Sequence, residues 1–331
     1  MNRCLSTLQE LEEEGYSAKA LRRLADRRKF PGRLDFSRDE FFEIRSKTID
    51  RMSISGVQEK ISLRLERGRL IPVSEEGEYI LKPVPGQPLP RFQQQVPANE
   101  HVTMQLAEQI WEVDTAANSC IRLADGELAY VTRRFDRRPD GTPIPQEDFC
   151  QLMDRTPASS GKHYKYNGSY QELAGALGDY CAAYVIESEK LFRRIVFNYL
   201  VANGDAHLKN FSLQRTGSFG DYLLTPAYDL MCTKLHLPNE SRLALDLFEG
   251  DEYPKGVTTH GFVTGGDLIE LGRRIGLLNE VTEEVVDWFC SRRDEARTLV
   301  DRSFLSDEAT QVYKAILEDR WKALELGAAS S

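Results

Sequence analysis

The apolar residues of this 331-residue chain change their spacing part of the way along it. From about residue 60 they alternate with polar residues, as Ile61, Leu63 and Leu65 do, which predicts half-buried strands. From about residue 145 they recur at helical spacing, as in the broad apolar face around Leu191 and Ile195. The change predicts an α+β protein in which a small strand-rich part precedes a larger helical part.

The same patterns place further elements. Five prolines between Pro83 and Pro97 keep that stretch out of helix and sheet interiors, and Asn99 is expected to cap the helix that follows. The helix around Leu191 should end at Asn203-Gly204. The other expected elements are strands at 68–73, 78–82 and 128–132, and helices at 267–277, 281–300 and 307–325.

Three parts of the chain can be distinguished. Residues 1–50 are expected to be a polar helical segment, residues 51–140 the small lobe and residues 141–331 the helical large lobe. The first part has a plausible apolar stripe formed by Leu8, Leu11, Tyr16, Leu21 and Leu24.

Composition excludes several classes of protein. The formal net charge of −9 argues against nucleic acid as the main partner. The six cysteines contain no C-x-x-C pair, which argues against both a disulfide framework and a zinc site. No signal peptide opens the chain, and no apolar run approaches the roughly 20 residues that a membrane span needs. We therefore expect a cytoplasmic protein with no membrane partner.

The strongest chemical motif follows the helix around Leu191. Asp205 and Asn210 are five positions apart, the spacing at which the catalytic loop of kinases presents a base and a magnesium ligand. Asp229 follows 24 residues after Asp205. A hairpin formed by 211–213 and 222–224 would return the chain so that Asp229 could hold magnesium with Asn210.

A lysine and a loop of small residues precede this motif. Lys82 ends an expected strand and could reach nucleotide phosphates, with Glu100 on the next helix as its partner. No G-x-G-x-x-G precedes Lys82, but the segment from Arg51 to Lys60 could present backbone N–H groups to phosphate. Each feature alone could be an ordinary turn, cap or surface lysine. Their order along two lobes favours a protein-kinase plan with the nucleotide between the lobes.

Six short segments together resemble the HipA family of toxin–antitoxin serine/threonine kinases. They are Ser53–Lys60, Ile80–Pro83, Asn99–Glu100, Arg134–Arg137, Pro145–Asp148 and Gly204–Phe211. The similarity runs from about Arg51 to Asp229 and keeps the order of the family. It implies a two-lobe, HipA-like kinase fold that uses ATP and Mg²⁺ to phosphorylate a serine or threonine.

The resemblance also implies a role for each matching residue. Asp205 would be the catalytic base, and Asn210 and Asp229 the magnesium ligands. Lys82 would bind phosphate with Glu100 beside it. The other nucleotide-binding residues would come from the phosphate loop, from the linker that meets adenine and from the catalytic loop: Ser55, Gly56, Val57, Gln58, Glu59, Lys60, Arg133, Arg134, Phe135, His207 and Lys209.

The loop that contains two serines, Ser53-Ile54-Ser55, resembles that of the short HipT type of this family. About 50 residues precede the loop, and HipT kinases lack an N-terminal subdomain that exists as a separate small protein, HipS. The resemblance implies HipS-like and DNA-binding HipB-like partners, with DNA reached only through the antitoxin. It also implies an aminoacyl-tRNA synthetase substrate, with tryptophanyl-tRNA synthetase expected. Autophosphorylation would fall on Ser53 or Ser55, where the added negative charge would repel ATP phosphates.

Two other functions remain open. Aminoglycoside and lipid kinases share the Asp-x4-Asn spacing, and lipid kinases also place a histidine two residues after the aspartate, as His207 is here. The serine loop and Arg134–Arg137 favour the HipA-like interpretation over both. A catalytically silent module that binds partner proteins is the second alternative. The intact set of polar groups argues against it.

Overall fold

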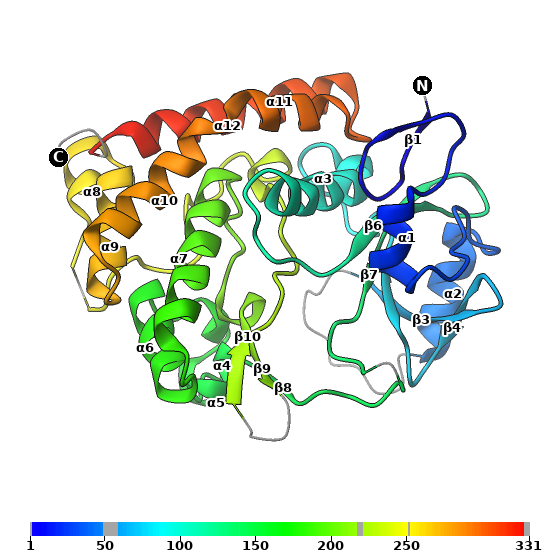
Figure 1. Cartoon of the computed structure of the whole chain (residues 1–331), viewed down its shortest axis with the longest axis horizontal. Helices are drawn as coiled ribbons and strands as arrows, with labels where there is room; N and C mark the ends of the chain where they lie inside the picture. The colour runs from blue at the N-terminus through cyan, green and yellow to red at the C-terminus, as the bar shows by residue number, and fades with distance from the viewer. Residues whose placement is uncertain (1, 49–58, 139, 217–220, 251, 328–331) are drawn as a thin grey trace.

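The computed structural model describes residues 2–48, 59–138, 140–216, 221–250 and 252–327. The alternating segments of the first half pair into a five-stranded antiparallel sheet in the order β4-β3-β5-β7-β6 (Figure 1). Its strands are β3 (Ile61–Glu66), β4 (Arg69–Val73), β5 (Tyr79–Lys82), β6 (Asn118–Arg122) and β7 (Leu128–Arg133). Four of these strands confirm the predicted ones, whereas β6 was not predicted.

Both faces of this sheet are covered, and the alternation of side chains decides which core each residue enters. Ala129 and Val131 of β7 belong to a core shared with the N-terminal segment. Tyr130, between them, points to the opposite face and into the core around helix α3 (Val96–Gln109). Lys82 pairs with Tyr130 in the register of β5 and β7, so its side chain also lies on the α3 face.

The N-terminal segment packs on the other face of the sheet. It contains two short strands, β1 (Asn2–Arg3) and β2 (Glu10–Leu11), and two helices, α1 (Ala18–Ala25) and α2 (Arg38–Thr48). The expectation of a helical segment is therefore only partly correct, since Leu8 and Leu11 lie outside any helix and Leu8 has a positive φ of 60°. Leu24 and Phe41 are fully buried in the core beneath the sheet.

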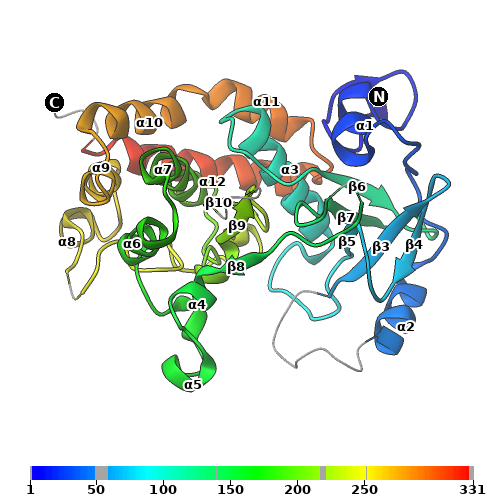
Figure 2. The same ribbon diagram turned by 60° about the horizontal axis from the view of Figure 1, so that its bottom comes forward.

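Helix α3 lies between the sheet and the helical lobe (Figures 1 and 2). It begins at Val96, three residues earlier than predicted, because Pro97 is tolerated in the first turn, where its missing N–H has no helical partner. Asn99 is thus not a cap. It is completely buried, and its side-chain amide donates to the carbonyl oxygen of Cys232 at 2.9 Å. Thr103, one turn further, hydrogen-bonds the Tyr313 hydroxyl at 2.9 Å, which joins the lobes.

The large lobe is built around helix α7 (Tyr184–Leu200), whose apolar face matches the predicted one. Trp111, at the end of α3, stacks on Phe289 of this lobe with ring centroids 5.5 Å apart. The predicted helix 281–300 is two helices with a break at Arg292. The other helices of this lobe are α4 (Phe149–Leu152), α5 (Pro157–Ser160), α6 (Tyr170–Tyr180), α8 (Lys255–His260), α9 (Gly265–Arg274), α10 (Asn279–Ser291), α11 (Arg293–Asp301) and α12 (Asp307–Glu325).

A small three-stranded sheet lies under α7 at the junction of the lobes (Figure 1). Strands β9 (Ser212–Thr216) and β10 (Asp221–Leu224) form the predicted hairpin, with Leu213 opposite Leu224. Strand β8 (Gln146–Asp148), which was not predicted, pairs with β9. None of the helices among the described residues is long and apolar enough to cross a membrane.

Candidate active site

A buried lysine on the sheet joins carboxylates from two distant segments. Lys82 Nζ donates to Glu100 Oε1 on α3 at 2.6 Å and to Asp229 Oδ1 at 2.5 Å. The side chains of Lys82 and Glu100 are 7% and 2% exposed, whereas that of Asp229 is 44% exposed. Lys82 thus connects the core of the small lobe to a carboxylate that solvent can reach.

The charges in this cluster fix its protonation. Burial alone would lower the pKa of Lys82, but Asp229 and Glu100 outweigh it and raise that pKa above its usual value. Burial would likewise raise the pKa of Asp229, yet the Lys82 ammonium holds it below the usual value. Lys82 is therefore an ammonium and Asp229 a carboxylate at neutral pH.

Backbone contacts hold Asp229 beneath the sheet. Ala227 pairs with the linker that follows α3, since its N–H donates to the Asp114 carbonyl at 2.8 Å and its carbonyl accepts from Ala116 N–H at 3.0 Å. Beyond Asp229, the N–H of Cys232 donates to the side-chain oxygen of Asn99 at 3.2 Å. Asp229 itself has a φ of 54°, a left-handed conformation that is strained for a residue other than glycine.

The loop after α7 presents Asp205 to solvent. Its backbone is held from inside, because Gly204 N–H donates to Thr233 Oγ1 at 2.7 Å and Asp205 N–H to Asn203 Oδ1 at 3.3 Å. The carboxylate of Asp205 is 47% exposed, and its Oδ1 accepts a short hydrogen bond from the Tyr166 hydroxyl. Lys165 Nζ lies 3.9 Å from the same oxygen. Asp205 can therefore accept a proton from an incoming hydroxyl.

His207 lies near both candidate carboxylates. Its Nε2 is 3.7 Å from Asp205 Oδ1, and both Asp205 and Asp229 act on its charge. Burial lowers the pKa of His207 to about 4, so the imidazole is neutral at pH 7. Its backbone N–H donates to Asn210 Oδ1 at 3.2 Å, which orients the side chain of Asn210. The histidine is thus a neutral side chain beside Asp205.

The side chain of Tyr228, which precedes Asp229, hydrogen-bonds the backbone next to Asn210. The Tyr228 hydroxyl donates to the carbonyl oxygen of Lys209 at 3.0 Å and lies 2.5 Å from Ser212 Oγ. Tyr228 and Lys209, which precede Asp229 and Asn210, are therefore hydrogen-bonded to each other. An exposed carboxylate and an amide oxygen are ligands that Mg²⁺ accepts, and magnesium in kinases is completed by phosphate oxygens and water rather than by a larger protein cluster. The donor set fits this ion.

The predicted nucleotide residues of the linker take different positions. Arg133 pairs with Asp26, at 2.9 Å between Nη1 and Oδ1, and Arg134 with Asp136, at 2.9 Å between Nε and Oδ1. Phe135 packs against Tyr228 with ring centroids 5.7 Å apart. Phe135 thus packs beside the segment of Asp229, and Arg134 is close enough to Lys60 to act on its charge.

Lys209 and the residues next to the predicted phosphate loop lie close to charged side chains of the site. Lys209 Nζ lies 3.7 Å from Asp148 Oδ2, and the Asp148 carboxylate raises the pKa of that lysine against the effect of burial. At the end of the predicted phosphate loop, Glu59 accepts a hydrogen bond from Gly86 N–H at 3.3 Å, and Lys60 is close enough for Asp229 and Lys82 to act on its charge. Ser53, Ser55, Gly56, Val57 and Gln58 lie outside the described residues.

Sequence reasoning missed Tyr166, Tyr228 and Thr233. Tyr166 is 39 residues from its partner Asp205, and it lies on a short 3-10 turn of no distinctive pattern. Tyr228 directly precedes Asp229 and could have been noticed for that reason. No sequence pattern marks Thr233, because its hydrogen bond to Gly204 N–H forms only when the two loops pack together.

Comparison with known proteins shows which family the chain resembles. Residues 52–297 match the model of the HipA-like C-terminal domain. The chain is 30% identical over 324 residues to a Haemophilus influenzae protein with a provisional kinase name, covering 92% of each. It is 27% identical to the serine/threonine-protein kinase toxin HipA of Shewanella oneidensis, covering 69% of this chain and 54% of that protein. It thus spans nearly all of the first relative and about half of the second.

Two solved structures share the fold. One is a chain of the Shewanella oneidensis complex of HipA, HipB and operator DNA, with a TM-score of 0.64 and 21% identity, covering 84% of this chain and 66% of that one. The other is the Helicobacter pylori proinflammatory kinase CtkA, with a TM-score of 0.52 and 14% identity, covering 80% and 91%. These similarities support a kinase-like fold with a small sheet-containing lobe and a larger helical lobe.

Proposed function

The chain belongs to the family of HipA-like C-terminal domains, and on this premise we propose that it is a protein serine/threonine kinase. ATP would donate the phosphoryl group and Mg²⁺ would assist. The observation that carries the proposal is the joining of Lys82, Glu100 and Asp229 across the lobes, beside a loop that exposes Asp205 and orients Asn210. A kinase needs these groups around one triphosphate.

Each residue would have a defined task. Lys82 would bind phosphate oxygens through its ammonium, which Glu100 holds in place. Asn210 and Asp229 would hold Mg²⁺, which neutralises charge on the phosphates when bound. Asp205 would take the proton of the acceptor hydroxyl. The acceptor oxygen then bonds to the γ-phosphorus, the bond to the β,γ-bridging oxygen breaks, and ADP leaves.

The biological setting that we propose is a toxin–antitoxin system. The Shewanella oneidensis complex contains HipA, HipB and operator DNA, which supports a HipB-like antitoxin as partner and DNA as an indirect one. The proposal extends to a HipS-like small protein as a further partner. It also includes an aminoacyl-tRNA synthetase as substrate, with tryptophanyl-tRNA synthetase expected, and autophosphorylation at Ser53 or Ser55. They rest on the resemblance of the loop to the HipT type. Thiophosphate labelling of a cell lysate would identify the substrate.

Labelled ATP tests the activity. The wild-type protein with Mg²⁺ should label itself, and mass spectrometry should find the phosphate on Ser53 or Ser55. Asp205→Asn keeps the size of the side chain but removes the base, so transfer should fall by about 10²–10⁴-fold while the fold is kept. Label on an added sugar or lipid, with none on protein, would favour a small-molecule kinase. Nucleotide binding with no transfer would favour a silent module.

A further inference from the structure

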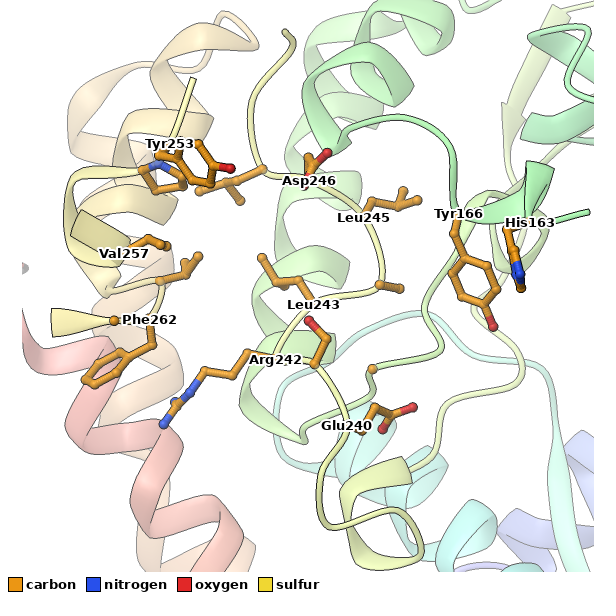
Figure 3. Close-up of a pocket in the computed structure, with 17 residues that line it drawn as sticks. His163, Tyr166, Glu240, Arg242, Leu243, Leu245, Asp246, Tyr253, Val257 and Phe262 are labelled. Atoms are coloured by element: carbon orange, nitrogen blue, oxygen red, sulfur yellow. The ribbon is translucent and has the colours of Figure 1, made fainter. Parts of the chain in front are cut away.

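A cavity lies in the large lobe, beside the loop that carries Asp205 (Figure 3). Its volume is about 740 Å³, and residues 240–247 and 253–263 form most of its wall. Gly204 and Tyr166 close the end nearest to Asp205. A cavity of several hundred Å³ is large enough for a few side chains of a bound ligand.

This end of the cavity is in direct contact with the candidate catalytic base. Tyr166 lines the cavity and donates its hydroxyl hydrogen to Asp205 Oδ1. Gly204, next to Asp205, packs on Glu240 so closely that a Cβ at Gly204 would lie 2.5 Å from the Cδ atom of Glu240. Figure 3 shows the side chain of Glu240 directed toward that of Tyr166. A ligand in this cavity would therefore reach the reacting groups.

Two carboxylates, those of Glu240 and Asp205, lie at this end, and the Lys165 ammonium is 3.9 Å from Asp205 Oδ1. Glu240 Oε2 is buried and accepts no hydrogen bond from the described residues. Burial raises the pKa of Glu240, Thr233 opposes this shift and the nearby carboxylate of Asp205 adds to it. Arg242, the arginine of the wall, is already neutralised by Asp319 at 2.9 Å. The carboxylate of Glu240 hydrogen-bonds the Thr233 side chain, and a cationic side chain entering here would pair with its Oε2 atom.

The far end of the cavity is apolar. Leu243, Val257 and Phe262 contribute to its wall, and Arg242 covers the Phe262 ring at 4.4 Å from the centroid. Tyr253 stands at the rim with 73% of its surface exposed. An exposed aromatic ring beside an apolar wall is typical of a surface that receives another large side chain.

We propose that this cavity binds the acceptor segment of a protein substrate. A lysine or arginine close to the acceptor serine or threonine pairs with Glu240. A large apolar side chain a few residues away packs against Tyr253, Val257 and Phe262. The acceptor hydroxyl takes the place of the Tyr166 hydroxyl, which hydrogen-bonds Asp205 Oδ1 in this structure. This inference rests on the proposed kinase activity and gives it a substrate class.

A positional peptide library with labelled ATP and the full chain tests the inference. The wild type should select a basic residue near the acceptor and a large apolar residue further along. Glu240→Gln should lower the ratio of kcat/KM for basic over neutral peptides by about 10-fold or more, since a charge-assisted pair is lost. Tyr253→Ser should lower kcat/KM for apolar peptides severalfold, mainly through KM.

Two exposed residues of the large lobe outside the cavity provide matched controls. Glu280→Gln and Leu278→Ser, at the start of α10, should keep wild-type selectivity. Tyr253 is so exposed that its variant should fold even if Glu240→Gln does not.

The possible failures can be told apart. Autophosphorylation without peptide selection, or selection that neither cavity variant changes, overturns this inference and leaves the kinase proposal standing. A wild type that labels neither itself nor any peptide overturns both.

Discussion

Replacing Lys82 by methionine should destabilise the fold as well as stop phosphoryl transfer. Methionine keeps the unbranched length of the side chain, so the change removes the ammonium and leaves little cavity. Glu100, whose side chain is 2% exposed, would then be a buried carboxylate that has lost its ammonium. Asp229 is 44% exposed and would recover its hydration. Most of the loss should therefore come from Glu100.

The magnitude follows from the burial of the pair. Breaking a buried ion pair by removing one partner costs about 3–5 kcal/mol in the free energy of unfolding. The wild-type contribution is complete at pH 7. Because the pKa of Lys82 is raised, its contribution to the free energy of unfolding is lost only as pH rises through this raised pKa. Because the pKa of Asp229 is lowered, its contribution is lost only as pH falls through this lowered pKa.

Urea unfolding at pH 7, followed by circular dichroism, measures the effect. Adding Glu100→Gln to Lys82→Met removes the buried charge and should return stability to within about 1–2 kcal/mol of the wild type. Neither protein should transfer phosphate. Lys322→Met, at an exposed lysine of α12, should change stability by less than about 0.5 kcal/mol. The reasoning fails if Lys82→Met costs less than about 1 kcal/mol, or if the double variant is no more stable than the single one.

Two further predictions concern groups around this cluster. Asp229→Asn should reduce phosphoryl transfer on the order of 10²–10³-fold and raise the Mg²⁺ concentration for half-maximal activity, and an unchanged magnesium titration would exclude Asp229 as a ligand. The pKa of His207 is about 4 in the folded protein, so stability should fall as pH drops from about 6.5 toward 4, where the unfolded chain binds the extra proton. His207→Gln should flatten this fall in urea midpoints, although not abolish it, because burial also lowers the pKa of His101 to about 4. The same slope in the variant would show that His207 does not contribute.

The elements that the sequence predicted well are those with a local cause. Alternation sufficed for β3, because one face of the strand is more buried than the other. The hairpin of β9 and β10 was predicted because it would return the chain so that Asp229 meets Asn210, and the helix 307–325 was predicted from its helical pattern. Strand β6 is buried throughout most of its length, so alternation could not reveal it. Asn99 looked like a cap but is a buried anchor for the segment of Cys232, which only packing could show.

The chain alone therefore determined which chemical groups are present and in what order: lysine, helix carboxylate, Asp-x4-Asn and a later aspartate. Short spacings are enforced by covalent geometry, and amphipathic periods follow from burial of one face, so both can be read along the sequence. The meeting of Lys82 with Asp229, 147 residues away, and the placing of Tyr166 and Glu240 beside Asp205, were decided only by the tertiary structure. Contacts between distant residues depend on how two lobes pack around α3, and no local pattern of a single chain encodes that packing.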